Sequence, residues 1–158
     1  MTLLEQLQDA AENARNGLPA ALTIDADGVQ YTRNFMPQER LILLGGGTIA
    51  QPLCRYAADL GFEVIVADDR PSFANYPRFP EAKQIVCDLF PAAIEKIGIR
   101  EGDYVAVITR GHRYDADCLR ELLRGIMPRY LGMIGSKKAS LGQISTAFIR
   151  PSVWTLVR

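Results

Sequence analysis

The chain has 158 residues, 48% of them hydrophobic, and its 18 lysines and arginines balance 18 aspartates and glutamates. This length suits one domain with a real hydrophobic core. Because the charges balance and no basic block is present, nucleic acid is a poor candidate as the main partner. No apolar run approaches the roughly 20 residues of a membrane helix. No signal peptide opens the chain, so we expect a cytoplasmic protein without a membrane partner.

The first part of the chain predicts a helix followed by a hairpin. Apolar residues recur at helical spacing up to Arg15, and Gly17 then ends the helix. Two short stretches, 20–24 and 29–32, flank an Asp-Gly pair that suits a tight reversal. We therefore expect residues 1–37 to form an N-terminal helix and hairpin extension, which packs on the sheet edge or on a second subunit.

The stretch R-L-I-L-L-G-G-G-T-I-A at residues 40–50 organises the rest of the chain. Four aliphatic residues before a glycine predict a parallel strand that is buried on both faces. Gly45, Gly47 and Ala50 fit the pattern G-x-G-x-x-[GA]. The first glycine permits a tight turn, the second lets a pyrophosphate approach, and the third small residue lets the helix pack on the strand.

The remainder of a βαβ unit follows the glycines. We expect a helix at 48–60 and a second strand at 62–67. The apolar residues at helical spacing, expected on the buried face, are Ile49, Leu53, Ala57 and Leu60. Asp68 then stands where dinucleotide-binding domains place the acid that holds the ribose hydroxyls. These features predict a site for a nucleotide or a pterin-like anion, and the alternative is a glycine turn that merely packs.

A proline-rich segment with aromatic residues follows the second strand. Arg70, Phe73, Tyr76 and Arg78 stand near the carboxyl end of that strand, at the edge where open α/β folds bind ligands. These side chains either line the site or pack as an ordinary loop, and the sequence leaves both interpretations open.

Three more strands and two helices complete the predicted fold. The expected strands are 83–87, 104–109 and 129–134, and the expected helices are 89–97 and 115–124. We predict a Rossmann-like, three-layer α/β fold over residues 38–138, with a mostly parallel sheet in the order 3-2-1-4-5.

The only histidine of the chain, His112, follows the fourth expected strand. It could orient a ligand, transfer a proton or pair with Asp115. Alternatively, both residues simply cap the next helix. One histidine without H-x-x-H or H-E-x-x-H spacing does not make a zinc site, so we expect no metal site.

Gly135, Ser136 and Lys137 follow the fifth expected strand. A glycine, a hydroxyl and a lysine suit an anion, although the spacing of a P-loop is missing. The three cysteines, in contrast, lack C-x-x-C spacing. Cys54 and Cys118 fall in expected helices, where packing is favoured over a sulfur-handling role.

Taken together, these motifs resemble the Rossmann-type domain of the XdhC/CoxI accessory proteins of molybdenum-containing hydroxylases. The resemblance covers roughly residues 38–138. It is carried by the stretches L-I-L-L-G-G-G-T-I-A, V-I-V-A-D-D-R-P, T-R-G-H and Y-L-G-M-I-G-S-K.

The resemblance implies a helper that binds molybdenum cofactor (molybdopterin), takes part in its sulfuration and hands it to an apo hydroxylase of the xanthine dehydrogenase type. It implies a carrier or chaperone rather than an enzyme, assigns no catalytic residue, and makes a cysteine desulfurase a further partner. We also expect a homodimer. The residues that it places around the cofactor are Gly45, Gly46, Gly47, Thr48, Asp68, Arg70, His112, Asp115, Gly135 and Ser136.

Two other functions stay open. One is an NAD(P)-dependent oxidoreductase, with NAD(P) or FAD as the cofactor, and the other is a nucleotide-sensing domain. The absence of a Tyr-x-x-x-Lys pair and of a separate substrate domain argues against the oxidoreductase. The pair Asp68-Asp69 argues against a 2′-phosphate on the ligand, although Arg70 weakens that inference.

The chain departs from the family's pattern at both ends. Larger members carry a separate domain before the Rossmann part, where this chain has only about 37 residues. The tail, residues 139–158, lacks the usual P-[IV]-G-L-D-I-G-A segment and reads P-S-V-W-T-L-V instead. A one-base slip in plausible codons can yield this change, so we hypothesise a frameshift. If the tail is shifted, a last strand of the sheet could be missing and the apolar segment at 154–157 exposed.

Overall fold

The structure is a computed structural model that describes residues 1–110, 114–134 and the backbone of 154–157. The helices are α1 (Leu3–Arg15), α2 (Ala50–Asp59), α3 (Phe90–Ile97) and α4 (Asp115–Arg124). The strands are β1 (Ala20–Ala26), β2 (Val29–Phe35), β3 (Arg40–Leu44), β4 (Glu63–Asp68), β5 (Gln84–Cys87), β6 (Tyr104–Val107), β7 (Tyr130–Ile134) and β8 (Trp154–Val157).

Among the described residues, the main sheet contains six strands in the order β5-β4-β3-β6-β7-β8, and each neighbouring pair is parallel. The first five strands stand in the expected 3-2-1-4-5 arrangement, so the Rossmann-like α/β fold is confirmed. The tail supplies β8 beside β7, so residues 154–157 add a sixth strand to the five that were expected. The chain leaves β3 toward β4 on one side and returns to β6 on the other, which makes a topological switch point between β3 and β6.

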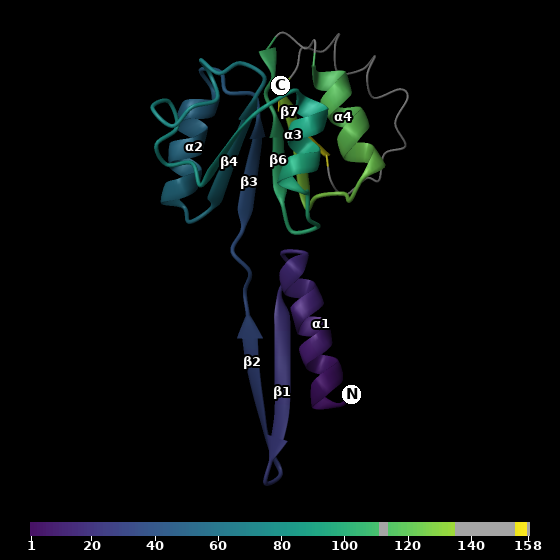
Figure 1. Cartoon of the computed structure of the whole chain (residues 1–158). Helices are drawn as coiled ribbons and strands as arrows, with labels where there is room; N and C mark the ends of the chain where they lie inside the picture. Colours follow the sequence, from purple (N-terminus) through teal and green to yellow (C-terminus); the bar gives the residue numbers. More distant parts are fainter. Residues whose placement is uncertain (111–113, 135–153, 158) are drawn as a thin grey trace.

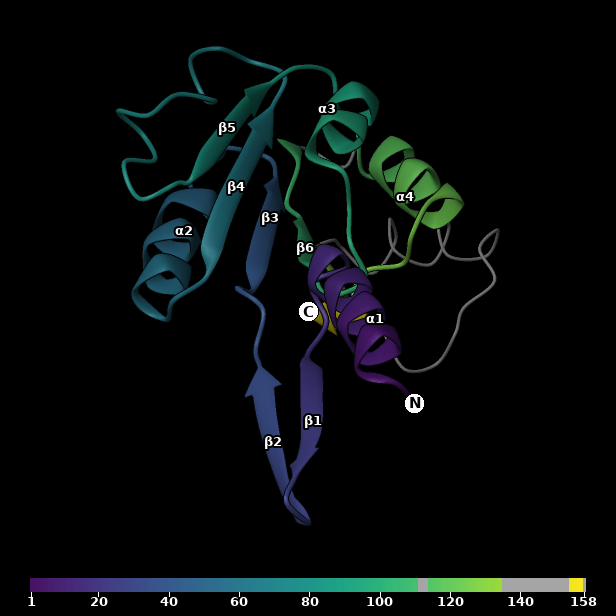
Figure 2. The same ribbon diagram turned by 60° about the horizontal axis from the view of Figure 1, so that its bottom comes forward.

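The sheet is buried on both faces because its central strands are apolar throughout. Ile42, Leu43 and Leu44 of β3 are completely buried. Ile42 and Leu44 belong to the cluster under α3 and α4, while Leu43 belongs to the cluster under α2. Figures 1 and 2 show these three layers, with α2 on one side of the sheet and α3 and α4 on the other.

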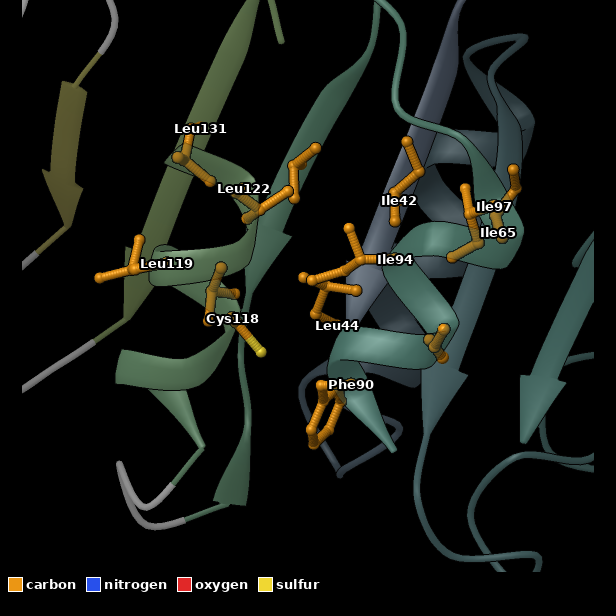
Figure 3. Packing of buried hydrophobic residues seen from close by; sticks show 14 of the residues in the cluster. Ile42, Leu44, Ile65, Phe90, Ile94, Ile97, Cys118, Leu119, Leu122 and Leu131 are labelled. Atoms are coloured by element: carbon orange, nitrogen blue, oxygen red, sulfur yellow. The ribbon is translucent and has the colours of Figure 1, made fainter. Parts of the chain in front are cut away.

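The larger cluster lies between the sheet and the helices α3 and α4. Phe90 and Ile94 of α3, together with Leu119 and Leu122 of α4, pack with Leu44 of β3 and its neighbours (Figure 3). Fully burying such a side chain contributes roughly 1.5–3 kcal/mol. This packing holds the strand ends, and with them the cleft described below, in fixed positions.

The buried face of α2 agrees with the predicted one at Ala57 and, in part, at Leu53, and differs from it at the two ends of the helix. Ile49 and Leu60 were expected inside, but they are 55% and 78% exposed. The helix buries Ala50, Cys54 and Ala57. Small side chains at these positions allow the helix backbone to lie close to the sheet directly after the glycine turn. The close approach of the helix backbone to the sheet therefore decides which face of α2 is buried, and the largest apolar side chains do not.

The N-terminal extension forms the predicted helix and hairpin. Thr2 and Glu5 make a capping box at the start of α1, and β1 and β2 pair as a separate antiparallel sheet. Asp27 and Gly28 turn the hairpin with positive φ angles of 55° and 77°. The extension projects from the end of the main sheet at which the strands begin (Figure 1). It contacts the loop before β6, where the Gly102 amide donates a hydrogen bond to the Asn16 carbonyl.

Candidate ligand-binding cleft

A cleft of about 390 Å³ opens at the carboxyl ends of β3, β4 and β6. It lies at the topological switch point, where open α/β sheets bind ligands. Its lining residues are Gly47, Thr48, Ile49, Ala50, Asp68, Arg70, Phe73, Ile108, Thr109 and Arg110. Gly47, Thr48, Asp68 and Arg70 were predicted as site residues, so the structure brings together residues from two of the predicted motifs.

The three glycines of the turn meet different surroundings. Gly45 has a φ of 120°, and a Cβ atom there would overlap the carbonyl oxygen of Ile108. A Cβ on Gly46 would lie 2.8 Å from the carbonyl oxygen of Phe73, so the loop after β4 covers this residue. A Cβ on Gly47 would meet open space. Gly45 thus makes the turn, Gly46 packs under the loop, and Gly47 borders the cleft.

The helix α2 begins at the cleft. Within the described chain its N-cap residue, Ile49, makes no side-chain capping hydrogen bond. The first backbone amides of a helix favour an anion where they lack other partners. In the first turn of α2, however, the amides of Ala50 and Leu53 donate to the carbonyls of Gly47 and Ile49, and Pro52 has no N–H, which leaves the amide of Gln51. A phosphate at this end of the cleft would therefore depend mainly on Thr48 and the loop backbone at Gly47, which line the cleft.

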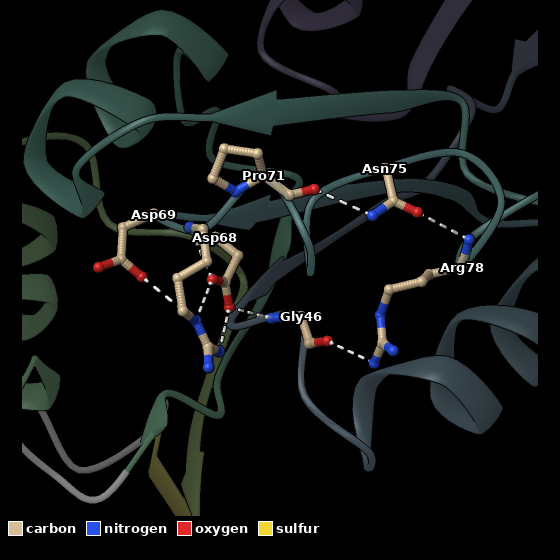
Figure 4. A network of polar contacts seen from close by, with 7 residues as sticks. Gly46, Asp68, Asp69, Pro71, Asn75 and Arg78 are labelled. Atoms are coloured by element: carbon tan, nitrogen blue, oxygen red, sulfur yellow. Dashed lines mark hydrogen bonds and ion pairs between the residues drawn. The ribbon is translucent and has the colours of Figure 1, made fainter.

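Asp68 ends β4 and is only 1% exposed. Its Oδ1 accepts hydrogen bonds from the amide and Nε of Arg70, at 3.0 and 2.9 Å. Its Oδ2 accepts from the amide of Gly46 at 2.8 Å and from Nη2 of Arg70 at 3.0 Å. Figure 4 shows this network, which joins β4 to the glycine turn.

Opposing influences act on the pKa of Asp68. Burial is the largest single influence and would raise the pKa, but the hydrogen bonds from Arg70 and Gly46 and the charge of Arg70 together hold it below its usual value of 3.8. The same partnership raises the pKa of Arg70. Asp68 is therefore ionised at neutral pH, and its charge is balanced inside the protein.

The proline-rich segment is an ordered loop that supplies part of the cleft wall. The guanidinium of Arg70 lies 3.5 Å from the ring centroid of Phe73, and that of Arg78 lies 4.8 Å from it. Arg78 also donates to the carbonyl of Gly46 at 3.2 Å (Figure 4). Of the four residues considered in the sequence, Arg70 and Phe73 line the cleft, whereas Arg78 supports Phe73 and Tyr76 is 55% exposed.

Asp115 lies beneath the cleft rather than on its wall. It begins α4, as predicted, and is fully buried. The hydroxyl of Thr109 donates a hydrogen bond to its carboxylate, which ties the end of β6 to α4. The other predicted residues, His112, Gly135 and Ser136, lie outside the described residues.

Thr109 and Arg110 also line the cleft. Thr109 ends the fourth predicted strand, 104–109, and Arg110 follows it. Since β6 is the neighbour of β3 in the predicted strand order, the residues at its carboxyl end reach the switch point. The predicted topology is therefore the signal that places these two residues at the same crevice as the glycine turn.

The cysteines fit the packing interpretation. Cys54 and Cys118 are buried, and burial raises the pKa values of their thiols to about 11 and about 12. Cys87 is exposed. In the part of the chain that the structure describes, no three His, Cys, Asp or Glu residues are grouped to hold a metal ion. Each helix described there is too short or too polar to span a bilayer.

Comparisons with known proteins agree with this geometry. Over 106 residues the chain is 31% identical to a probable xanthine dehydrogenase subunit of Bacillus subtilis (strain 168), and the match covers 67% of the chain and 32% of that protein. It is 30% identical over 100 residues to the uncharacterized protein YqeB of Escherichia coli (strain K12), covering 63% of the chain and 18% of that protein. The chain thus spans a third or less of the length of these relatives.

A solved structure is similar over a larger part of the chain. The crystal structure of a xanthine dehydrogenase from Bacillus halodurans superposes with a TM-score of 0.70 and 32% identity, covering 83% of this chain and 38% of that one. The XdhC Rossmann domain matches residues 41–146, which hold the glycine turn, the Asp68–Arg70 pair and the strands around the cleft. The chain belongs to the XdhC Rossmann domain family.

Proposed function

We propose that this chain is a cofactor-binding accessory protein for a hydroxylase of the xanthine dehydrogenase type. In this proposal it binds molybdenum cofactor in the cleft, assists the sulfuration of that cofactor and delivers it to the apo hydroxylase in the cytoplasm. The partners are the hydroxylase, a cysteine desulfurase and a second copy of the chain. Family membership and the names of two similar proteins support the link to xanthine dehydrogenase.

The observation that carries the proposal is the chemistry of the cleft at the switch point. Thr48 and the backbone at Gly47 would hold the phosphate of the cofactor, while Arg70 and Arg110 would balance its charge. A volume of about 390 Å³ is adequate for a tricyclic pterin. The cofactor would supply the molybdenum and its dithiolene sulfurs, and the chain's own residues would bind and orient it.

No second function is proposed, because Asp68 does not suit the role that a nucleotide would require of it. An oxidoreductase or nucleotide sensor of the Rossmann type uses this acid to hold the ribose hydroxyls. Here both carboxylate oxygens already accept hydrogen bonds from Gly46 and Arg70.

Activation of an apo hydroxylase tests the proposal. The chain is loaded with molybdenum cofactor, freed of unbound cofactor and mixed with cofactor-free hydroxylase from the same organism. We expect more hydroxylase activity than an equal amount of free cofactor produces. The Arg110→Ala variant should deliver less, and Arg129→Gln, which removes a positive charge from the opposite end of the sheet, should deliver as much as the parent chain. Equal activation by free cofactor would contradict the proposal.

A further inference from the structure

We infer that the end of β4 recognises a phosphate monoester through Arg70, and that Asp68 is a positioning residue rather than a ligand for ribose. This inference rests on the proposed function only in taking the cleft as the cofactor site. It reverses the role that the position of Asp68 in the sequence suggests.

Hydrogen-bond donors from the protein occupy the Asp68 carboxylate. An ionised carboxylate has about four sites at which it can accept hydrogen bonds. Four donors, from the amide of Gly46 and from the amide, Nε and Nη2 of Arg70, lie within 3.0 Å of the two oxygens. The side chain is 2% exposed. A ribose diol in the cleft therefore finds no free acceptor on this group.

Contacts with the neighbouring aspartates fix the orientation of Arg70. Its Nε and Nη2 edge faces Asp68, and Nε also lies 3.7 Å from Oδ1 of Asp69. Among the described residues, Nη1 has no acceptor within hydrogen-bond distance, whereas the side chain is 22% exposed and lines the cleft. A guanidinium that is hydrogen-bonded to a carboxylate along one edge presents its remaining N–H groups in a fixed direction. This arrangement suits the oxygens of a phosphate.

The ring of Phe73 supports the guanidinium group of Arg70. The ring of Phe73 stacks on Arg70 at 3.5 Å, and Arg78 lies 4.8 Å from the same ring. Stacking on an aromatic face limits the tilt of a guanidinium. Arg78 is fixed in turn by its hydrogen bond to the carbonyl of Gly46. Arg70 is therefore held by Asp68 on one edge and by the ring of Phe73 on its face.

The charges around this position favour a dianion over a neutral diol. Of the charged residues that line the cleft, Arg70 and Arg110 are positive and Asp68 is negative, so the lining carries one more positive than negative charge. A phosphate monoester carries about −1.5 to −2 charges at neutral pH. Two ligand classes share this chemistry, namely a dinucleotide with a 2′-phosphate and a phosphorylated pterin.

Matched ligand pairs test the inference by titration calorimetry. One pair is adenosine 2′,5′-bisphosphate and AMP. The other is the fluorescent oxidised pterin of molybdopterin, with and without its phosphate. In one of the pairs we expect the phosphate monoester to increase affinity about tenfold or more, as a charge-assisted hydrogen bond would. Preference in the first pair identifies a 2′-phosphorylated nucleotide, and preference in the second identifies a phosphorylated pterin.

Variants of Arg70 and Asp68 test whether these residues cause the preference for the phosphate-bearing ligand. In Arg70→Gln the preference should fall to within about threefold, because the charged donors are gone. The matched control Arg129→Gln should keep the full preference. Asp68→Asn should reduce the preference while leaving affinity for the ligand without the phosphate unchanged, as expected of a residue that acts through Arg70. Circular dichroism checks that each variant is folded.

Three results would overturn the inference. One is that no phosphate-bearing ligand binds better than its partner. Another is an unchanged preference in Arg70→Gln. The third is tight binding of AMP that Asp68→Asn abolishes, which would restore the acid as a ribose ligand. If the chain activates the apo hydroxylase but shows no preference for a phosphate, this inference is wrong and the proposed function stands. If the preference is limited to the nucleotide pair and the chain does not activate the hydroxylase, the proposed function is wrong and this inference stands.

Discussion

Gly45 holds the turn at the head of the cleft in a conformation that other residues rarely adopt. Its φ is 120°, and a Cβ atom would overlap the backbone of Ile108. We expect Gly45→Ala to lower the free energy of unfolding by about 2–5 kcal/mol, since a strained φ and overpacking both contribute. Urea denaturation measures this change.

Gly47→Ala is the matched control, because its Cβ would meet open space. We expect it to change stability by less than about 0.5 kcal/mol. Equal losses in the two variants would show that the distinction between the packed glycine and the open one is wrong.

Asp68 makes stability depend on pH in a defined direction. Because its pKa in the folded protein lies below the usual 3.8, its contribution is complete above that pH and declines as the pH falls through the folded value. Asp68→Asn should therefore be less stable than the parent chain at about pH 6, and the gap should shrink toward about pH 3. Urea denaturation at the two pH values provides the test, and a constant gap would contradict the assignment.

Among single residues, the sequence identified those that obey a spacing rule. The positions of Gly45, Gly47 and Asp68 follow from a strand, a glycine turn and a known interval to the second strand. The partnership of Asp68 with Arg70 could not be predicted, because it depends on the side-chain direction two residues after a strand. The stacking of Phe73 on two arginines depends likewise on the path of a loop without regular periodicity.

At the scale of elements, a buried ion pair links the start of β3 to the start of β6. Arg40 donates to Asp103 through Nε at 2.9 Å and through Nη2 at 2.6 Å. Asp103 is 1% exposed and also accepts a hydrogen bond from the amide of Arg100 at 2.7 Å. The pair therefore fixes the loop before β6 against the central strand.

Removing the acid of this pair should be costly. We expect Asp103→Ala to lower the free energy of unfolding by about 3–5 kcal/mol, because it leaves a largely buried guanidinium unpaired. Asp117→Ala breaks the exposed pair with Arg120 and should cost less than about 1 kcal/mol. Thermal or urea unfolding compares the two variants, and a small loss in Asp103→Ala would show that Arg40 finds another partner or water.

Most elements were predictable because their apolar periods are strong. The helix α4 begins and ends where predicted, at Asp115 and Arg124. The parallel strands were found as short apolar runs between turns. The buried face of α2 was predicted in part, since Ala57 is buried and Leu53 packs against the same cluster, whereas Ile49 and Leu60 are exposed. Periodicity alone cannot sense how closely the backbone approaches the sheet.

At the scale of the whole molecule, the N-terminal extension lies at the end of the sheet opposite to the carboxyl ends of β3, β4 and β6 (Figure 1), and the cleft borders those carboxyl ends. The extension exposes many large apolar side chains. They are Leu3, Leu4, Leu7, Ile24, Val29, Tyr31, Phe35 and Met36. An apolar surface of this extent favours association, which is the basis of the proposed homodimer.

Sedimentation velocity tests the dimer. Tyr31→Ser and Phe35→Ser together remove two exposed side chains of β2, so they should shift the parent chain's dimer toward monomer without unfolding the main sheet. Tyr56→Ser, which changes a 65% exposed residue on α2, should leave the dimer intact. A parent chain that sediments as a monomer at all concentrations would contradict the homodimer.

The central claim is that the cleft at the carboxyl ends of β3, β4 and β6 binds molybdenum cofactor. The most direct measurement is the amount of pterin that stays with the chain through gel filtration, with NAD(H) offered to a parallel sample. We predict about one pterin per chain for the parent and for Arg129→Gln, and a clear loss in Arg70→Gln and Arg110→Ala. Retention of NAD(H) instead of pterin, or equal retention of pterin in all variants, would contradict the account.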